Sequence, residues 1–124
     1  EEALRYVGPV NGLFRRVTRD IEYKGKKLRE NDNVWIMFAS ANRDERHFES
    51  PESFIIERSP NDHLSLGKGV HFCMGAALAR LEAQIAFEHL VDVLPGFELK
   101  PEEGLRIPVP VLRGWIKLPM IRKV

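Results

Sequence analysis

The sequence contains a single cysteine, and it lacks long apolar runs and a strong net charge. One cysteine excludes an internal disulfide framework and fits a reducing cytosol, so we expect a cytoplasmic protein. A formal net charge of +1 is too small to indicate a nucleic acid or an anionic membrane as partner. No segment is apolar for long enough to span a bilayer, and none reads as a signal peptide. We therefore expect neither nucleic-acid nor membrane binding.

The residues that are present have the composition of an ordinary globular domain. Hydrophobic residues make up 44% and charged residues 30% of 124 residues, which is about the length of one domain. The first residues, "EEALRY", read as the inside of a helix, because no capping residue and no turn precede them. We therefore expect residues 1–124 to be the back part of something longer.

Short strands, turns and helices alternate along the chain, which predicts an α+β fold. Residues 14–25 read as a strand, and the Lys24-Gly25 turn folds residues 26–33 back into a hairpin. The apolar run "VWIMFASA" fits either a buried strand or the start of a helix. The other expected elements are a helical end at residues 1–7, an irregular meander at 42–66, one long helix from Met74 to about Leu94, and edge hairpins at 107–121.

The only thiol lies in the segment "LSLGKGVHFCMGAALAR", residues 64–80. Gly67, Gly69 and Gly75 have no side chains, so flat or bulky matter can approach the backbone there. The helix expected directly after Cys73 turns its positive end towards the sulfur, which favours a thiolate. This combination suits a metal-bound thiolate beside a large planar ligand.

Several chemistries are open to this cysteine. Zinc would need further ligands from His47, His63, His71 and His89, and the spacing from His71 to Cys73 is not a finger pattern. A cysteine nucleophile would need a base and an oxyanion hole that the sequence does not show. An axial thiolate on haem iron needs only one cysteine. The plain alternative is a small buried hydrophobe, the common role of a lone cysteine.

The same segment resembles the haem-binding loop of the cytochrome P450 superfamily, Phe-x-x-Gly-x-His-x-Cys-x-Gly. Gly69, His71, Cys73 and Gly75 fit this pattern, whereas Leu66 stands where the family usually has phenylalanine. A leucine keeps the apolar shielding without the ring, so we expect a shifted redox potential rather than lost ligation. The resemblance runs along essentially the whole chain, in the family's order, and is to the C-terminal portion of a soluble bacterial member. The other matching segments are Glu2-x-x-Arg5, "ASANRD" (39–44), "FESPESF" (48–54), "ALARLE" (77–82) and "VLRGWIKLPM" (111–120).

The resemblance implies haem b (iron protoporphyrin IX) as cofactor, with Cys73 as the axial ligand of the iron. It implies that His71 is a partner of a haem propionate. Arg15, five positions before Asp20, is similar to the family's propionate-binding arginine, and its neighbour Arg16 is the fallback. The loop residues implied to lie against the haem are Leu66, Gly67, Gly69 and Gly75.

Glu2 and Arg5 resemble the family's structural ion pair, which locks the meander behind the haem. The pair usually has an arginine as its third member. Because Ser53 occupies one common position for that arginine, Arg58 is the candidate. The plain alternative for Glu2 and Arg5 is a surface pair three residues apart on a helix.

The resemblance also implies partners. Apolar residues at two places where family members line the substrate pocket suggest an apolar small-molecule substrate, although apolar loop residues are more often core. These candidates are Val10, Leu13, Phe14, Val111 and Leu112. A basic face for an acidic, ferredoxin-type electron donor is the second expectation, with a generic charged surface as its alternative. The residues assigned to this face are Arg43, Arg46, Arg58 and Lys68.

The function implied by the resemblance is that of a haem-thiolate monooxygenase, an oxidoreductase that inserts one oxygen atom of O2 into an organic substrate. The family's oxygen-activating helix has no counterpart in these 124 residues. The alternative is a non-catalytic truncated remnant or module that folds by self-association, with or without haem. Truncation would expose apolar surface, so we expect a homo-oligomer.

Overall fold

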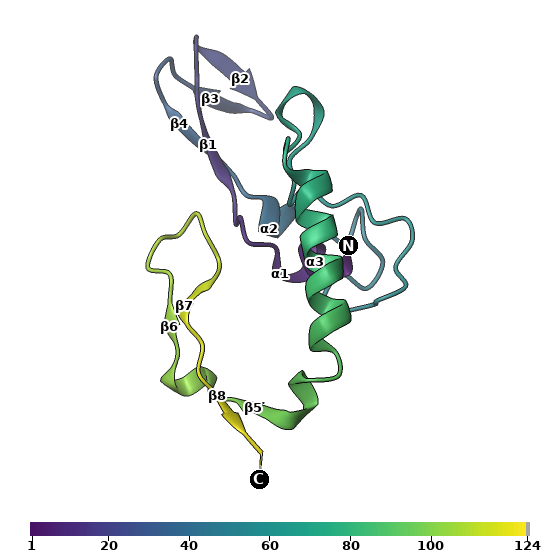
Figure 1. Cartoon of the computed structure of the whole chain (residues 1–124). Helices are drawn as coiled ribbons and strands as arrows, with labels where there is room; N and C mark the ends of the chain where they lie inside the picture. The colour runs from purple at the N-terminus through teal and green to yellow at the C-terminus, as the bar shows by residue number, and fades with distance from the viewer. Residues whose placement is uncertain (124) are drawn as a thin grey trace. The chain divides into compact units, whose positions relative to one another are not determined.

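The computed structural model describes residues 1–123 (Figure 1) and divides into two compact units. The first unit consists of residues 1–65 together with 110–112, and the second of residues 66–109 together with the chain from residue 113 onward. Both units combine short helices with two-stranded antiparallel sheets, so the predicted α+β class is confirmed. Within residues 1–123, none of the helices has both the length and the hydrophobicity that crossing a membrane requires.

The first unit contains a short helix, two small sheets and a long irregular segment. Helix α1 (Glu2–Val7) ends at Gly8, before Pro9, as predicted. Strand β1 (Leu13–Arg16) pairs with β4 (Asn33–Ile36), and β2 (Ile21–Tyr23) pairs with β3 (Lys26–Leu28). Lys24 and Gly25 have φ angles of 48° and 74°, which are the left-handed values that a two-residue hairpin turn requires. The predicted hairpin is therefore present.

One prediction in this unit is corrected, and one open alternative is decided. The expected continuous strand over residues 14–25 is broken between β1 and β2, where Val17 is buried and its N–H donates to the Asp32 carbonyl at 2.9 Å. The run at residues 34–41, which fits a strand or the start of a helix, contains both. Its first residues belong to β4, and the single-turn helix α2 (Phe38–Ala41) follows. From residue 42 to 65 the chain has only turns and bends, as the absence of periodicity predicted.

The second unit begins with the cysteine segment. A 3-10 turn, η1 (Gly69–His71), precedes the main helix α3 (Ala76–Leu90), and η2 (Leu94–Gly96) follows it. The tail forms two ladders separated by η3 (Pro101–Glu103): β5 (Phe97–Leu99) pairs with β8 (Met120–Arg122), and β6 (Leu105–Arg106) pairs with β7 (Trp115–Lys117). Strands are thus present in the predicted tail at residues 107–121, but their partners β5 and β6 lie before it, so the predicted bounds of the hairpins are too narrow.

The predicted limits of the long helix, Met74 to about Leu94, are too wide at both ends. Gly75 is the N-cap, and the Ala76 N–H closes a turn onto the Cys73 carbonyl at 3.2 Å, so Met74 lies in that turn. At the other end Pro95 has no N–H to continue the helical pattern, and the chain tightens into η2. The helix therefore begins three residues after Cys73 rather than directly after it.

Little of the apolar surface is buried, and the buried polar side chains are at least as prominent. Leu78, Leu81, Ile85 and Leu90, the predicted apolar side of α3, are all exposed. The buried hydrophobic residues are Val17, Phe48 and Ala76, and the buried polar residues are Glu2, Arg5, Asn42 and Ser65.

We predict that Gly12→Ala destabilises the first unit strongly. A Cβ at Gly12 would lie 2.3 Å from the Ile36 carbonyl oxygen and 2.5 Å from Trp35 Nε1, so backbone has to move. Overpacking of this kind costs about 1–3 kcal/mol of unfolding free energy, measurable by urea denaturation. Gly96→Ala is the matched control, because a Cβ there meets nothing within 4 Å. Equal stability of the two variants would contradict the prediction.

Candidate functional site

Cys73 lies in a loop that is closed by its own backbone. The Cys73 N–H donates to the Leu66 carbonyl at 2.8 Å, and the Phe72 N–H donates to the Gly69 carbonyl at 3.0 Å. The Cys73 thiol is exposed and is not in a disulfide. The plain alternative of a buried cysteine is therefore wrong for this structure, because the loop presents the sulfur at the surface.

Two of the predicted glycines are required by the backbone of this loop. Gly67 and Gly69 have φ angles of 74° and 63°, which side-chain-bearing residues rarely adopt. A Cβ on Gly67 would also lie 2.6 Å from the His71 carbonyl oxygen. Gly75 differs, because it is the N-cap of α3 and a Cβ there would lie 3.8 Å from the Cys73 sulfur.

The surroundings of the thiol fit a flat apolar group held by a single sulfur ligand. Val70, three residues before Cys73, is 97% exposed, Met74 directly after it is 101% exposed, and half of Phe72 is exposed. The loop therefore offers apolar contact surface and open glycine backbone together with a free sulfur. Among residues 1–123, no three His, Cys, Asp or Glu side chains lie close enough to hold a metal ion together. Haem coordinated by one thiolate needs no such group.

The other predicted haem contacts fall in different units. His71 is the last residue of η1 and is exposed, and Leu66 is half-buried at the start of the same loop. Arg15 belongs to β1 of the first unit, where its side chain is exposed and its Nη1 donates to the Phe14 carbonyl at 3.0 Å. Asp20 accepts the Glu30 N–H at 2.8 Å.

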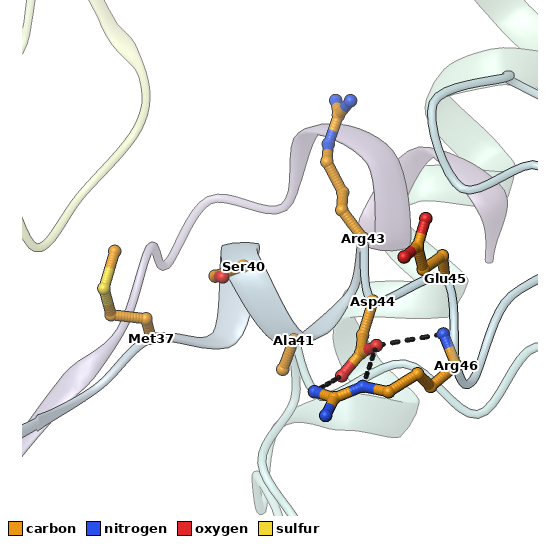
Figure 2. Close-up of a pocket in the computed structure, with 7 residues that line it drawn as sticks. All are labelled: Met37, Ser40, Ala41, Arg43, Asp44, Glu45 and Arg46. Atoms are coloured by element: carbon orange, nitrogen blue, oxygen red, sulfur yellow. Dashed lines mark hydrogen bonds and ion pairs between the residues drawn. The ribbon is translucent and has the colours of Figure 1, made fainter.

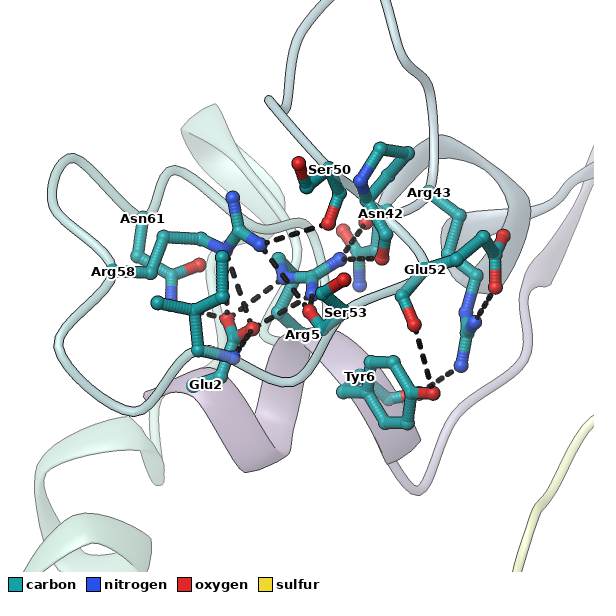
Figure 3. Close-up of polar contacts among 12 residues, drawn as sticks. Glu2, Arg5, Tyr6, Asn42, Arg43, Ser50, Glu52, Ser53, Arg58 and Asn61 are labelled. Atoms are coloured by element: carbon teal, nitrogen blue, oxygen red, sulfur yellow. Dashed lines mark hydrogen bonds and ion pairs between the residues drawn. The ribbon is translucent and has the colours of Figure 1, made fainter.

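Glu2, Arg5 and Arg58 form a buried ion-pair cluster (Figure 3). Arg5 donates from Nε and Nη2 to the two carboxylate oxygens of Glu2 at 2.8 and 2.7 Å, and the Arg58 Nε lies 3.2 Å from both oxygens. Arg5 is 1% exposed and Glu2 is 3% exposed. A surface pair is therefore wrong for Glu2 and Arg5, and Arg58 lies where the third member was expected.

The cluster fastens the irregular segment to α1. Arg5 Nη1 donates to the carbonyls of Asn42 and Pro51, both at 2.8 Å, while Nη2 also donates to the Ser53 carbonyl at 2.9 Å. The Ile55 N–H donates to Glu2 Oε1 at 2.9 Å. A planar guanidinium has donors in several directions, so one arginine satisfies carbonyls that have no strand to pair with.

These contacts shift the acid–base equilibria of both partners. The hydrogen bond from Arg5 is the largest cause that lowers the pKa of Glu2 from 4.5 to about 2, against the opposing effect of burial. The Ile55 N–H and Arg58 lower the pKa of Glu2 further. Glu2 in turn raises the pKa of Arg5, so both groups remain charged at neutral pH.

The expected basic face is largely engaged in ion pairs. Arg58 is 7% exposed and bound to Glu2, so assigning it to a basic surface is wrong. Arg43 pairs with Glu52 and stacks over the Tyr6 ring at 4.0 Å. Arg46 donates directly to the Asp44 carboxylate at 2.9 and 2.6 Å (Figure 2) and lowers the pKa of that carboxyl to about 2. Two of the four assigned residues are exposed, Arg46 in its pair with Asp44 and Lys68 in the cysteine loop.

The substrate-lining candidates all belong to the first unit. Val10 and Leu112 form an antiparallel bridge, and the Asn11 N–H donates to the Val111 carbonyl at 2.8 Å, so the structure brings residues 10 and 111–112 together. Leu13 and Phe14 are adjacent in β1 and point to opposite faces, and Phe14 stacks on Trp35 with ring centroids 5.6 Å apart. Leu13 and Phe14 therefore do not line one wall together.

The sequence interpretation missed Asn42 and Ser65, which are buried and hydrogen-bonded to each other at 2.8 Å. Asn42 was noted only as part of the segment "ASANRD". Its position directly after an apolar run is the available signal, because a polar residue that such a run carries into the interior must be hydrogen-bonded there.

We predict that acid unfolds the first unit through Glu2. Because its folded-state pKa lies below 4.5, the unfolded chain binds this proton more readily, so the contribution of Glu2 is complete above pH 4.5 and is lost between pH 4.5 and 2. The shift corresponds to about 3 kcal/mol. Urea titrations at several pH values should show this fall, and Glu2→Gln should flatten it while lowering stability at neutral pH. Exposed Glu22→Gln is the control, and an unchanged acid dependence in Glu2→Gln would refute the assignment.

The chain is similar along nearly its whole length to known proteins. The Cytochrome P450 family model matches residues 1–118. Polyketide biosynthesis cytochrome P450 PksS of Bacillus subtilis (strain 168) is 49% identical over 97% of this chain and 30% of its own length. Among solved structures, CYP109E1 from Bacillus megaterium in complex with testosterone is 41% identical, with a TM-score of 0.87 over 99% of this chain and 34% of that one.

A second similar solved structure is P450BioI in complex with hexadec-9Z-enoic acid ligated acyl carrier protein. It is 39% identical, with a TM-score of 0.86, and the match covers 98% of this chain and 32% of that chain. The chain therefore spans about a third of the length of the relatives it matches. With a family model that matches 118 of its 124 residues, the chain belongs to the cytochrome P450 family.

Proposed function

We propose that this chain is the C-terminal, haem-ligating portion of a cytochrome P450 monooxygenase. The observation that carries the proposal is the exposed thiol of Cys73 in a glycine-rich loop flanked by apolar side chains. Haem b, when bound through its iron to this thiolate, supplies the chemistry that activates O2. The family match along residues 1–118 supports the same role.

The residues of this chain would hold and orient the haem. The Cys73 thiolate would be the axial ligand, and its loop is closed by the hydrogen bond from the Cys73 N–H to the Leu66 carbonyl. Val70 and Phe72 would cover apolar ring surface, because both side chains are exposed beside the sulfur. His71 and Arg15 would bind the two propionates by charge-assisted hydrogen bonds, since both side chains are exposed.

The reaction would insert one oxygen atom of O2 into an apolar organic substrate. The second oxygen atom leaves as water, which requires two electrons and two protons, so a redox partner is part of the proposal. An apolar substrate is supported by the exposed Leu13, Phe14 and Leu112 and by the steroid and fatty-acyl ligands of the related structures. A ferredoxin-type donor is proposed from the family resemblance, with Lys68 as the exposed cation of the cysteine loop.

A second candidate is a module that folds by self-association without catalysis. The exposed apolar side chains of α3 favour self-association. Contiguous apolar patches on a protein surface commonly mark places where another surface binds. The two candidates differ in one measurable property, which is whether the chain binds haem through a thiolate.

We predict that the reconstituted chain gives a CO-bound, reduced Soret band shifted far to the red, and that Cys73→Ala abolishes it. Alanine has no side-chain atom that can bind the iron, so the Cys73→Ala chain should show no such band. His89→Ala is the matched control, since it removes a possible metal ligand outside the loop and should keep the band. Persistence of the band in Cys73→Ala would show that another residue is the ligand, and no haem uptake by the wild-type chain would favour the second candidate.

We further predict that the purified chain without haem is a homo-oligomer, because burial of its exposed apolar side chains is favourable by about 25 cal/mol for each Å². Light scattering should give a mass above the 14.3 kDa of one chain. Replacing Leu81 and Ile85, both exposed on α3, by serine should reduce the associated fraction. A clean monomer at all concentrations would contradict the prediction.

A further inference from the structure

Asn42 occupies a buried position at the end of α2, and all of its polar groups are engaged except one amide hydrogen. Its Nδ2 donates to Ser65 Oγ at 2.8 Å, and its Oδ1 accepts the Leu64 N–H at 2.7 Å. Its carbonyl accepts Arg5 Nη1 at 2.8 Å, and its own N–H donates to the Phe38 carbonyl at 2.9 Å. With 1% exposure, Asn42 joins the Glu2–Arg5–Arg58 cluster to residues 64 and 65.

Ser65 is held equally firmly. Its hydroxyl accepts from Asn42 and donates to the Leu4 carbonyl at 2.5 Å, and its N–H donates to His63 Nδ1 at 3.3 Å. Gly8 makes this approach possible, because a Cβ there would lie 2.4 Å from the Ser65 hydroxyl. Two hydrogen bonds of the Ser65 hydroxyl and one from the Ser65 N–H therefore hold this residue in place.

The cysteine loop starts at the next residue. Ser65 is the last residue of its stretch in the first unit, and Leu66 is the first residue of the second unit. The Leu66 carbonyl accepts the Cys73 N–H at 2.8 Å. Only the backbone dihedrals of residues 65 and 66 lie between this carbonyl and the buried Ser65 hydroxyl. The contacts of Leu64 and Ser65 therefore hold the residue from which the chain enters the loop.

We infer that Asn42 is a positioning residue for the Cys73 ligand, acting through Leu64 and Ser65 on the first peptide of the loop. The side chain at position 42 must accept the Leu64 N–H and also donate to the Ser65 hydroxyl. An amide does both, whereas aspartate can only accept and leucine can do neither. The inference rests on the proposed role of Cys73 as haem ligand, but its main test needs no haem.

The test is residue-resolved amide hydrogen exchange on the 124-residue chain carrying Asn42→Leu, which keeps the approximate volume and removes both hydrogen bonds. The Cys73 amide should exchange about five- to tenfold faster than in the wild type, the factor that one or two lost hydrogen bonds produce. The Lys123 amide, which donates to the Gly96 carbonyl in the same unit, should keep its rate. Equal acceleration of both amides would mean general destabilisation and would overturn the inference, as would an unchanged Cys73 rate.

Ser65→Ala is the milder second variant, in case Asn42→Leu does not fold. It removes one hydroxyl and should accelerate the Cys73 amide in the same selective way. Because both variants break the bond between Asn42 and Ser65, the double variant should accelerate exchange by less than the product of the two single effects. Full multiplicative behaviour would refute the relay. Asn33→Leu, at an exposed position in β4, is the matched control and should leave the Cys73 amide unchanged.

A spectroscopic readout separates positioning from support of the fold. In the haem-loaded chain, Asn42→Leu should lower the share of the red-shifted CO complex relative to Asn33→Leu, because a misdirected thiolate is lost from the iron more readily. An equal share in the two variants would overturn the positioning role. If the wild-type chain takes up no haem, the proposed function fails, and the exchange experiment still decides whether Asn42 orders the loop.

Discussion

The buried contact between the Glu2 carboxylate and the Arg5 guanidinium is the interaction on which the first unit depends. Residues 42–65 form no helix or strand in which their backbone carbonyls could be hydrogen-bonded. Arg5 donates to three of these carbonyls, and Glu2 neutralises the charge of Arg5. Charged groups that are this buried are stable only when each is paired and hydrogen-bonded. Loss of either partner would leave the other as an uncompensated charge, so the pair and the irregular segment are stable only together.

A chain of contacts leads from this pair to the candidate ligand. The Asn42 carbonyl touches Arg5, the Asn42 side chain holds Leu64 and Ser65, and Leu66 closes the cysteine loop. The loop itself contributes a thiol, left-handed glycines and exposed apolar residues, which are the properties that a planar metal ligand requires. The polar contacts of the first unit therefore reach the residue directly before the loop, which is the basis of the inferred role of Asn42.

The sequence predicted most of the local structure, because local signals determine it. Gly8-Pro9 ends α1, Lys24-Gly25 turns the hairpin, and the glycines around Cys73 require positive φ angles. The start of α3 was misplaced because helical periodicity does not reveal that Gly75 is the cap. Burial of Arg58 and Asn42 depends on contacts with residues 56 and 23 positions away, and no local pattern encodes such distances. The family motif identified Cys73, whereas propensity alone left zinc and nucleophilic chemistry open.

The polar character of the first unit has a thermal consequence. Exposure of apolar surface raises the heat capacity on unfolding, whereas exposure of polar surface lowers it. The buried side chains of this unit are Glu2, Arg5, Asn42 and Ser65 against only Val17 and Phe48. Its heat-capacity change is therefore small for its size, and its stability curve is flat. Such a unit loses little stability on cooling, and the temperature range over which residues 42–65 stay ordered is set by charge pairing more than by hydrophobic burial.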